Sequence, residues 1–277
     1  EDLGCNDKDL MTGKEAITKP HGMILSTGPT GSGKSTTLYA LIQLINSREI
    51  NISTIEDPVE YDIPGVNQIQ VDPKTNLTFA KGLRSLLRQD PDVIMVGEIR
   101  DEETAAIGVN SAMTGHLVLS SLHTNDAATA LPRLIDMKVE PFLIASTMQI
   151  IIAQRLVRKI CMQCIVSYTL NDAQKKDLYR HELLLKDLPA NSEDDIRVYK
   201  GSGCSNCNNT GFKGRIGLFE VMQINDKVRE LVMQQSNSDD LRAAAIVSGM
   251  TTMLQDGIKK VMAGKTTIEE VLRVTSE

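Results

Sequence analysis

Short apolar runs alternate with segments of helical spacing along the first half of the chain. The runs predict buried strands at Met23–Thr27, Ile50–Ile55, Val93–Val96 and Leu117–Leu122. Apolar residues three and four positions apart predict helices between them, over Ser35–Asn46, Thr78–Arg88 and Glu102–Thr114. Strands joined by helices of this length imply right-handed crossovers, so we expect an α/β fold with a mostly parallel central sheet.

Polar residues follow each of these predicted strands. The first strand runs into a glycine-rich loop, the second into Glu56-Asp57-Pro58-Val59-Glu60, the third into Gly97-Glu98 and the fourth into His123. Ligands of parallel sheets bind at the carboxyl ends of the strands. The sequence therefore predicts one polar site at this edge of the sheet.

The second half of the chain has a different pattern. From about Lys159 cysteine, glycine and asparagine dominate the turns, and from Asn225 short helices are predicted, the last with a capping box at Thr267 and Glu270. We expect four segments: a connector from a missing N-terminal domain over 1–20, the α/β core over 21–158, a cysteine-bearing element over 159–217 and a small helical subdomain over 218–277.

Composition narrows the functional classes. Of the 277 residues, 41% are hydrophobic and 24% are charged, as in a soluble globular protein. The net charge of −6, the aromatic share of 3% and the absence of Trp argue against a nucleic-acid interface. No apolar run reaches the ~18 residues of a membrane span. Residue 1 is Glu, which indicates a fragment.

The glycine-rich loop matches the pattern G-x-x-x-x-G-K-[ST] between a predicted strand and a predicted helix. Glycines allow successive backbone N–H groups to converge on phosphate oxygens, and the helix N-terminus adds positive potential. We expect Lys34 to reach the β- and γ-phosphates and Ser35 to bind Mg²⁺. The predicted nucleotide-binding residues are Gly28, Pro29, Thr30, Gly31, Ser32, Gly33, Lys34, Ser35 and Thr36.

Hydrolysis of a nucleotide requires a group that orients a water molecule. Glu98 follows the strand after which a Walker B acid is expected, and Gly97 stands in the position of the usual aspartate. We therefore expect Mg²⁺ to be held through Ser35 and bound water, and Glu98 to polarise the attacking water. The alternative for Glu98 is a carboxylate that only satisfies a helix N-terminus.

Two histidines flank the fourth predicted strand. His116 and His123 are seven residues apart, and an odd separation places them on opposite faces and at opposite ends of a strand. His123, at the carboxyl end, is the better candidate for a γ-phosphate sensor, and His116 is expected to support other residues or to be structural.

Four of the five cysteines form two Cys-x-x-Cys pairs, Cys161 with Cys164 and Cys204 with Cys207. Two such pairs predict a structural Zn²⁺ with four thiolate ligands. A redox-active pair is the alternative, although such a site needs only one pair. Together with a nucleotide site, these cysteines favour a reducing cytosol.

The combined motifs resemble those of the secretion ATPase superfamily, most nearly the type II secretion motor ATPases and the type IV pilus assembly ATPases. The resemblance covers the chain from Lys19 to its end. It is carried by the phosphate loop, Glu56–Glu60, Leu86–Asp101, Thr114–His116 and Leu122–Asn125.

The resemblance implies a RecA-like ATPase domain in a hexameric ring with ATP at the subunit clefts. It places Glu56 and Glu60 in the family's aspartate box, Glu98 as the Walker B glutamate, and His116 and His123 in its histidine box. Functionally sensitive arginines of the family map onto Arg84, Arg88, Arg100 and Arg133. The residues expected to carry catalysis are Glu98, Lys34, Glu56, Glu60, His123, Arg84 and Arg88.

The resemblance also implies partners. They are ATP with Mg²⁺, copies of the chain in a homohexamer, an inner-membrane platform protein and a cytoplasmic assembly protein, with no direct nucleic-acid contact. The four-cysteine element favours secretion or pilus extension, and the protein is expected in the cytoplasm, peripherally bound to the inner membrane. Three alternatives stay open: pilus retraction, a DNA-uptake or conjugation translocase, and a scaffold that binds nucleotide without hydrolysis.

Overall fold

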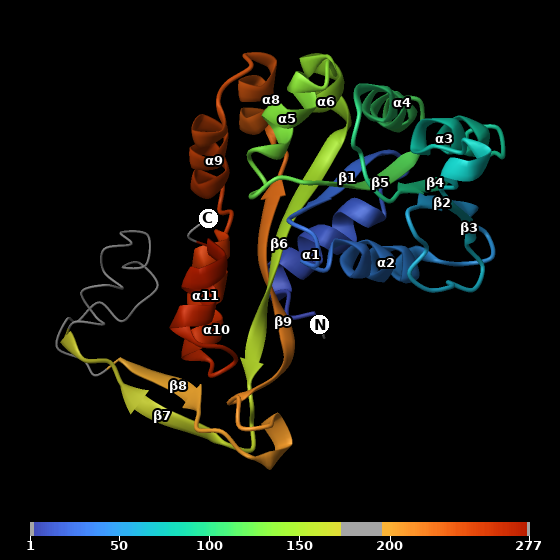
Figure 1. Ribbon diagram of the computed structural model, residues 1–277. Coiled ribbons are helices and arrows are strands. Elements are labelled where there is room, and N and C mark those ends of the chain that lie inside the picture. The colour runs from blue at the N-terminus through green and yellow to red at the C-terminus, as the bar shows by residue number, and fades with distance from the viewer. Residues whose placement is uncertain (1–2, 173–195, 276–277) are drawn as a thin grey trace. The chain divides into compact units, whose positions relative to one another are not determined.

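The computed structural model describes residues 3–172 and 196–275 (Figure 1). By its internal contacts the chain divides into two compact units. Unit 1 comprises residues 6–154 and 221–250, and unit 2 comprises the rest of the described chain. The four segments expected from the sequence stay a prediction, because these units group the chain by contacts alone.

Unit 1 is built on a mostly parallel sheet with the strand order β3-β2-β4-β5-β1-β6-β9. Its strands are β1 (Gly22–Thr27), β2 (Ile52–Glu56), β3 (Asn67–Gln70), β4 (Val93–Val96), β5 (Leu117–Leu122), β6 (Met148–Ile160) and β9 (Phe212–Gln223). β6 and β9 have residues in both units. Neighbours from β3 to β6 pair in parallel, which confirms the predicted parallel α/β sheet.

Helices cover both faces of this sheet, with α1 and α2 on one face and α3 and α4 on the other (Figure 1). The helices of unit 1 are α1 (Asp7–Ile17), α2 (Lys34–Ile45), α3 (Phe79–Leu86), α4 (Glu102–Met113), α5 (Ala130–Asp136), α6 (Pro141–Thr147), α8 (Asp226–Met233) and α9 (Ser238–Val247), with a short 3-10 helix η1 (Pro73–Thr75). Apolar side chains of α3 pack on β2 and β4 in a cluster that comprises Ile55, Phe79, Leu83, Leu86, Ile94 and Val96.

Several elements of unit 1 were not predicted, and two of them, α1 and β3, lie in polar segments. The polar segment expected to be a connector contains α1, whose first turn is capped by the Asn6 side chain and which packs on α2. Strand β3 is polar and only partly buried, because it lies at the edge of the sheet. Neither element carries the continuous apolar pattern that reveals the buried strands.

Unit 2 contains an antiparallel pair of strands, β7 (Ile165–Thr169) and β8 (Arg197–Gly201). It also contains the helices α10 (Met253–Met262) and α11 (Ile268–Thr275) and a short 3-10 helix η3 (Ser205–Cys207). Unit 2 buries an ion pair between Asp256 and Lys260, and both charges have further partners. The Phe219 N–H donates to Asp256 over 2.8 Å, and the Lys260 ammonium donates to the Gly217 carbonyl over 2.7 Å.

The capping box predicted for the last helix is half formed. The Thr267 hydroxyl accepts from the Glu270 N–H over 3.4 Å, but the Glu270 carboxylate does not accept from the Thr267 N–H. It accepts instead from Arg158 and Arg273, at distances from 2.8 to 3.1 Å. Two guanidinium groups are stronger donors than one backbone N–H, so the ionic contacts prevail.

Glu270 makes the stability of unit 2 dependent on pH. Burial opposes ionisation of its carboxyl group, but hydrogen bonds from Arg273 and Arg158 lower the pKa from 4.5 to about 2. The ionised carboxylate therefore stabilises the folded state fully above pH 4.5, and this contribution disappears as the pH falls towards 2. We expect Glu270→Gln to lower the free energy of unfolding at pH 7 by roughly 1.5–3 kcal/mol.

Calorimetric unfolding between pH 3 and pH 7 tests this expectation. The difference between wild type and Glu270→Gln should shrink below pH 4.5. Glu230→Gln, in the exposed pair with Lys227 on α8, is the matched control and should change stability little at any pH. A wild-type to variant difference that stays constant with pH would contradict the role of the ionised carboxylate.

Candidate functional site

The carboxyl ends of four parallel strands meet along one edge of the sheet. β2, β4, β5 and β1 are consecutive neighbours, and their registers align Ile55 with Val96 and Val96 with Ser120. The segments that follow these strands therefore lie side by side, as expected from the sequence. They carry the phosphate loop, the acidic segment, Glu98 and His123.

The phosphate loop joins β1 to α2. Gly28 has a φ of 145°, and a Cβ there would lie 2.5 Å from the Gln154 carbonyl oxygen, so only glycine fits. Helix α2 begins after Gly33 without a side-chain cap, which leaves its first N–H groups directed into the loop. The Lys34 ammonium donates to the carbonyls of Gly28 and Pro29 over 2.8 and 3.1 Å.

This loop fits a bound triphosphate. The Ser32 hydroxyl is buried without a hydrogen-bond partner among the described residues, and Ser35 and Thr36 are exposed at the first turn of α2. Uncapped N–H groups, an ammonium group and exposed hydroxyls are the donors and metal ligands that a Mg²⁺-bound phosphate chain requires. The residues from Gly28 to Thr36 could therefore hold the nucleotide.

Gly97 connects β4 to the candidate general base. Its N–H donates to the Ile55 carbonyl over 2.8 Å, and its carbonyl accepts from the Ser121 hydroxyl over 2.7 Å. A Cβ at this position would lie 3.3 Å from both the Glu56 Cα and the Ile55 carbonyl oxygen. The close approach of β2 explains why glycine occupies the position of the usual Walker B aspartate.

Glu98 is held between a histidine and an arginine. Its Oε1 lies 2.6 Å from Nε2 of His123, and its Oε2 accepts from Nε of Arg100 over 2.6 Å. The Glu98 side chain is 13% exposed, whereas both partners are about half exposed. Arg100 also lies 3.5 Å from Asp57 and stacks over the Phe79 ring at 5.9 Å. The hydrogen bond to Glu98 raises the pKa of Arg100.

Glu56 lies in a different environment from the one expected of a catalytic acid. It is buried, and its carboxylate accepts from the Tyr39 hydroxyl, from the Thr54 hydroxyl over 2.6 Å and from the Gln68 amide over 3.1 Å. The Tyr39 hydroxyl in turn accepts from the Glu60 N–H over 3.3 Å. Burial and the contact with Glu56 raise the pKa of Tyr39, so it remains a donor. Glu56 thus orders the loop from Asp57 to Glu60.

Other predicted residues lie apart from Glu98. His116 precedes β5 and bonds through Nδ1 to the Ser111 carbonyl over 3.1 Å, which places it at the opposite end of the strand from His123. The Glu60 side chain is exposed. Arg84 forms an exposed pair with Glu103. Arg84 and Arg88 line a shallow cavity of about 580 Å³ on α3, and Arg133 is exposed on α5.

Unit 2 carries a second candidate site. The sulfur atoms of Cys161, Cys164, Cys204 and Cys207 all lie within 4.8 Å of one another. Measured pairs are 3.7 to 3.9 Å apart, close to the ~3.8 Å edge of a tetrahedron with metal–sulfur bonds of ~2.3 Å. These four thiols could therefore hold a four-coordinate ion.

Backbone N–H groups donate hydrogen bonds to one sulfur atom of this cluster. The N–H groups of Cys204 and Gly211 each donate to the Cys207 sulfur over 3.3 Å. Burial opposes ionisation of Cys207, but these hydrogen bonds lower the pKa of its thiol to about 6. Burial raises the pKa of Cys164 to about 11. The hydrogen bonds thus favour the thiolate form of Cys207, which is the form that binds a metal ion.

Sequence reasoning missed the residues that support the site. Tyr39 occupies a buried position of α2 that its helical period does not separate from the aliphatic residues around it. Gln68 belongs to the polar edge strand β3. No signal identifies either residue, because each contributes through a contact made across the fold. The ion pair between Arg100 and Asp57 likewise depends on side-chain directions, which the sequence pattern does not reveal.

Comparison with known proteins identifies a matching family. A family model described as Type II/IV secretion system protein matches residues 1–273. The Type II secretion system protein HxcR of Pseudomonas aeruginosa is 48% identical over 277 residues, which are 100% of this chain and 53% of that protein. The Type IV pilus assembly ATPase PilB of Myxococcus xanthus is 45% identical over 274 residues, 99% of this chain and 47% of that protein. The chain thus spans about half the length of these relatives.

Solved structures share the fold. The pilus retraction motor PilT with bound ADP has a TM-score of 0.71 at 31% sequence identity. The match covers 100% of this chain and 66% of PilT. The ATPase DotB of Legionella pneumophila has a TM-score of 0.67 at 23% identity, with 99% of this chain and 64% of DotB covered. The DotB comparison concerns the fold alone.

The contacts of Tyr39 generate a prediction about the acidic loop. Tyr39→Phe removes the hydroxyl that accepts from the Glu60 N–H and donates to Glu56. We expect faster hydrogen exchange of the Glu60 amide and a loss of roughly 1–3 kcal/mol in stability, because a buried carboxylate oxygen loses its donor. Hydrogen exchange measured by mass spectrometry over residues 57–61 checks this expectation.

Tyr61→Phe is the matched control for this variant. The Tyr61 ring packs edge-on against the Tyr39 ring at 4.7 Å, and the substitution keeps that contact. It should leave exchange at Glu60 unchanged. Equal exchange in the two variants would show that the Tyr39 hydroxyl does not order the loop.

Proposed function

The chain belongs to the type II/IV secretion system protein family, and from this premise we propose that it is the ATP-hydrolysing motor portion of a longer protein. The observation that carries the proposal is the position of Glu98. It lies at the strand edge that also carries the phosphate loop, and it is held by His123 and Arg100. A purely structural carboxylate does not require this combination.

The phosphate loop supplies the binding energy for Mg·ATP. Backbone N–H groups at the start of α2 donate to the phosphate oxygens. The Lys34 ammonium, which donates to the carbonyls of Gly28 and Pro29 in the structure, would donate to the more strongly charged phosphate oxygens instead. Ser35 would be the protein ligand of Mg²⁺, since Gly97 offers no carboxylate. When bound, Mg²⁺ would supply positive charge that offsets the charge developing on the phosphate oxygens.

Glu98 prepares the attacking water. In the structure both of its oxygens have partners, so one contact has to be exchanged for the water whose proton Glu98 accepts. His123 is the residue that we propose as the γ-phosphate sensor, since its movement towards a phosphate frees Oε1 of Glu98. Glu56 and Tyr39 contribute by holding the Asp57–Glu60 loop in place.

Two exposed arginines at and just after α3 suit a contribution between copies of the chain. Arg84 lies on α3 and Arg88 follows its end, and both line the same shallow cavity as Lys81. A homohexamer would allow such arginines to approach the nucleotide of a neighbouring subunit and stabilise transition-state charge. Sedimentation of the full-length protein with Mg·ATP tests the assembly.

The machine that the motor drives is proposed from the relatives. Proteins named for type II secretion and for type IV pilus assembly match the chain at 48% and 45% identity, so we propose protein secretion or pilus assembly through a membrane platform protein. None of the helices among the described residues is long and apolar enough to cross a membrane. We therefore propose peripheral association through partners, with a cytoplasmic assembly protein.

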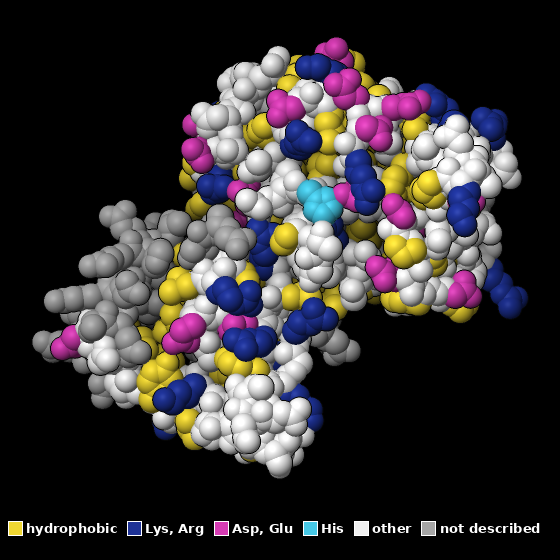
Figure 2. All heavy atoms as spheres, viewed as in Figure 1, with side chains coloured by type: hydrophobic (Ala, Val, Ile, Leu, Met, Phe, Trp, Pro, Cys, Tyr) yellow, Lys and Arg dark blue, Asp and Glu magenta, His cyan; other side chains and the backbone are white. Residues whose placement is uncertain are grey.

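DNA translocation is the less favoured function. Basic and acidic side chains are interspersed on the face shown in Figure 2, and the chain carries a net charge of −6. A nucleic-acid channel requires a continuous basic surface. Stimulation of the ATPase by DNA would favour the translocase, and capture of a membrane platform protein by the full-length protein would favour the secretion or pilus motor.

The four cysteines are proposed to hold one structural Zn²⁺. Their sulfur atoms have tetrahedral spacing, and no ligand position is left for a catalytic water. Zinc is the ion that four thiolates select most readily. In this role the ion fixes the turn between β6 and β7 to the turn that precedes β9.

Substitution of Glu98 tests the hydrolytic mechanism. Glu98→Gln in the full-length protein should bind ATP with an affinity within about twofold of wild type, while kcat falls by roughly 10²–10⁴ because the amide cannot accept the proton of water. Phosphate release and calorimetric titration measure the two quantities. Glu102→Gln, an exposed change at the first turn of α4, is the control. Turnover of Glu98→Gln near the wild-type rate would remove Glu98 from the mechanism.

Removal of one cysteine tests the metal site. Cys207→Ser should lower the zinc content from about one ion per chain to a small fraction, and a chelator should unfold the cysteine region in wild type, since metal binding and local folding are coupled. Elemental analysis and circular dichroism provide the readouts. Cys5→Ser, outside the cluster, should keep its full zinc content. A disulfide found by mass spectrometry in the metal-free native protein would support the redox alternative instead.

A further inference from the structure

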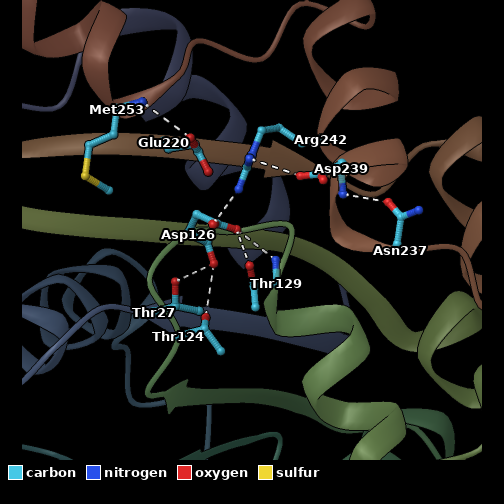
Figure 3. A network of polar contacts seen from close by, with 9 residues as sticks. All are labelled: Thr27, Thr124, Asp126, Thr129, Glu220, Asn237, Asp239, Arg242 and Met253. Carbon is cyan, nitrogen blue, oxygen red and sulfur yellow. Dashed lines mark hydrogen bonds and ion pairs between the residues drawn. The ribbon is translucent and has the colours of Figure 1, made fainter. Parts of the chain in front are cut away.

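Asp126 connects four segments of unit 1 at the carboxyl edge of the sheet (Figure 3). Its backbone carbonyl accepts from the hydroxyl of Thr27 over 3.4 Å and from that of Thr124 over 3.0 Å. Its Oδ1 accepts from the N–H and the hydroxyl of Thr129, each over 2.8 Å. Its Oδ2 accepts from Nη2 of Arg242 over 2.6 Å. One residue thus joins the end of β1, the loop after β5, the start of α5 and helix α9.

These contacts lie next to the candidate catalytic residues. Thr27 is the last residue of β1, immediately before the phosphate loop, and Asp126 is three residues beyond His123. Only two residues separate His123 from Asp126, so both belong to one short loop after β5. The position of the His123 loop is therefore coupled to whatever holds the Asp126 carboxylate.

Arg242 is the partner that holds this carboxylate from outside the loop. The Asp126 side chain is 22% exposed and the Arg242 side chain 36%, so the pair is partly shielded from water. A charge-assisted contact of 2.6 Å in such a position is stronger than an exposed surface pair. The second acidic partner of Arg242, Asp239, lies at 3.5 Å and is 86% exposed.

Helix α9 is a rigid support for Arg242. Its first turn is capped by the Asn237 side chain, which accepts from two backbone N–H groups, and its inner face is anchored by Leu241 and Ala245. The chain passes from unit 1 into unit 2 between Met250 and Thr251, three residues after the last residue of α9. A shift of α9 therefore moves the segment of chain that leads into unit 2.

We propose that the Asp126–Arg242 ion pair positions the His123 loop for hydrolysis and transmits the movement of that loop to helix α9. Arg242 is then a positioning residue, which acts on Glu98 through Asp126 and His123 without contact with the nucleotide. The inference rests on the proposed ATPase function. It adds the element through which the chemical step and the C-terminal helices of unit 1 communicate.

Arg242→Gln in the full-length protein tests the proposal, with Asp239→Asn as the matched control because it removes only the longer, exposed contact of the same guanidinium. Arg242→Gln should lower kcat roughly 10–100-fold with the KM for ATP nearly unchanged, since misplacement of a catalytic group affects turnover more than binding. Arg242→Lys keeps the charge and should restore part of the rate. Asp239→Asn should behave as wild type.

Hydrogen exchange distinguishes transmission from a purely structural role. In wild type, addition of a non-hydrolysable ATP analogue should change exchange both at the phosphate loop and in α9. In Arg242→Gln the change at the phosphate loop should remain and the change in α9 should be lost. If Arg242→Gln does not fold, Asp126→Asn carries the same comparison, because the amide oxygen still accepts from Thr129 while the ion pair is lost.

The outcomes separate this proposal from the ATPase assignment. A wild-type protein that neither binds nor hydrolyses ATP would overturn the proposed function. A wild-type protein that hydrolyses ATP, together with an Arg242→Gln variant whose kcat or α9 exchange matches that of Asp239→Asn, would overturn the positioning role alone.

Discussion

The parallel pairing of β2, β4, β5 and β1 is the constraint on which the rest of unit 1 depends. Parallel pairing brings all four carboxyl ends to the same edge, so segments far apart in the sequence emerge side by side. The strands are buried along their whole length, so the groups accessible to a ligand belong to the residues just beyond them. The phosphate loop and Glu98 owe their proximity to this arrangement and to no direct contact between them.

Polar contacts then order the edge. Tyr39 and Glu56 secure the acidic loop, Arg100 and His123 engage Glu98, and Asp126 joins the His123 loop to α9. Most of these groups are at least partly shielded from water, so their contacts persist and have defined geometry. The same shielding means that movement of one member disturbs its neighbours, which suits the proposed role of this site in a motor.

The sequence predicts this arrangement unevenly. Apolar runs such as Val93–Val96 reveal buried strands, and spacing alone makes Lys34, Ser35 and the four cysteines candidate ligands. The position of Glu98 follows from the parallel sheet. By contrast, the hydrogen bond between Tyr39 and Glu56 and the ion pair between Arg158 and Glu270 depend on side-chain contacts between distant segments. Local periodicity contains no information about such contacts. Helix α1 was not predicted because its sequence is polar and lacks a clear apolar period.

The crowding around Gly97 restricts how this site can change by mutation. An aspartate at that position would add metal affinity, yet its Cβ would press on the backbone of β2 at Ile55 and Glu56. Acquisition of that ligand therefore requires a small shift of the β2 backbone in addition to the substitution itself. The spacing of two neighbouring strands thus limits which side chains can follow β4.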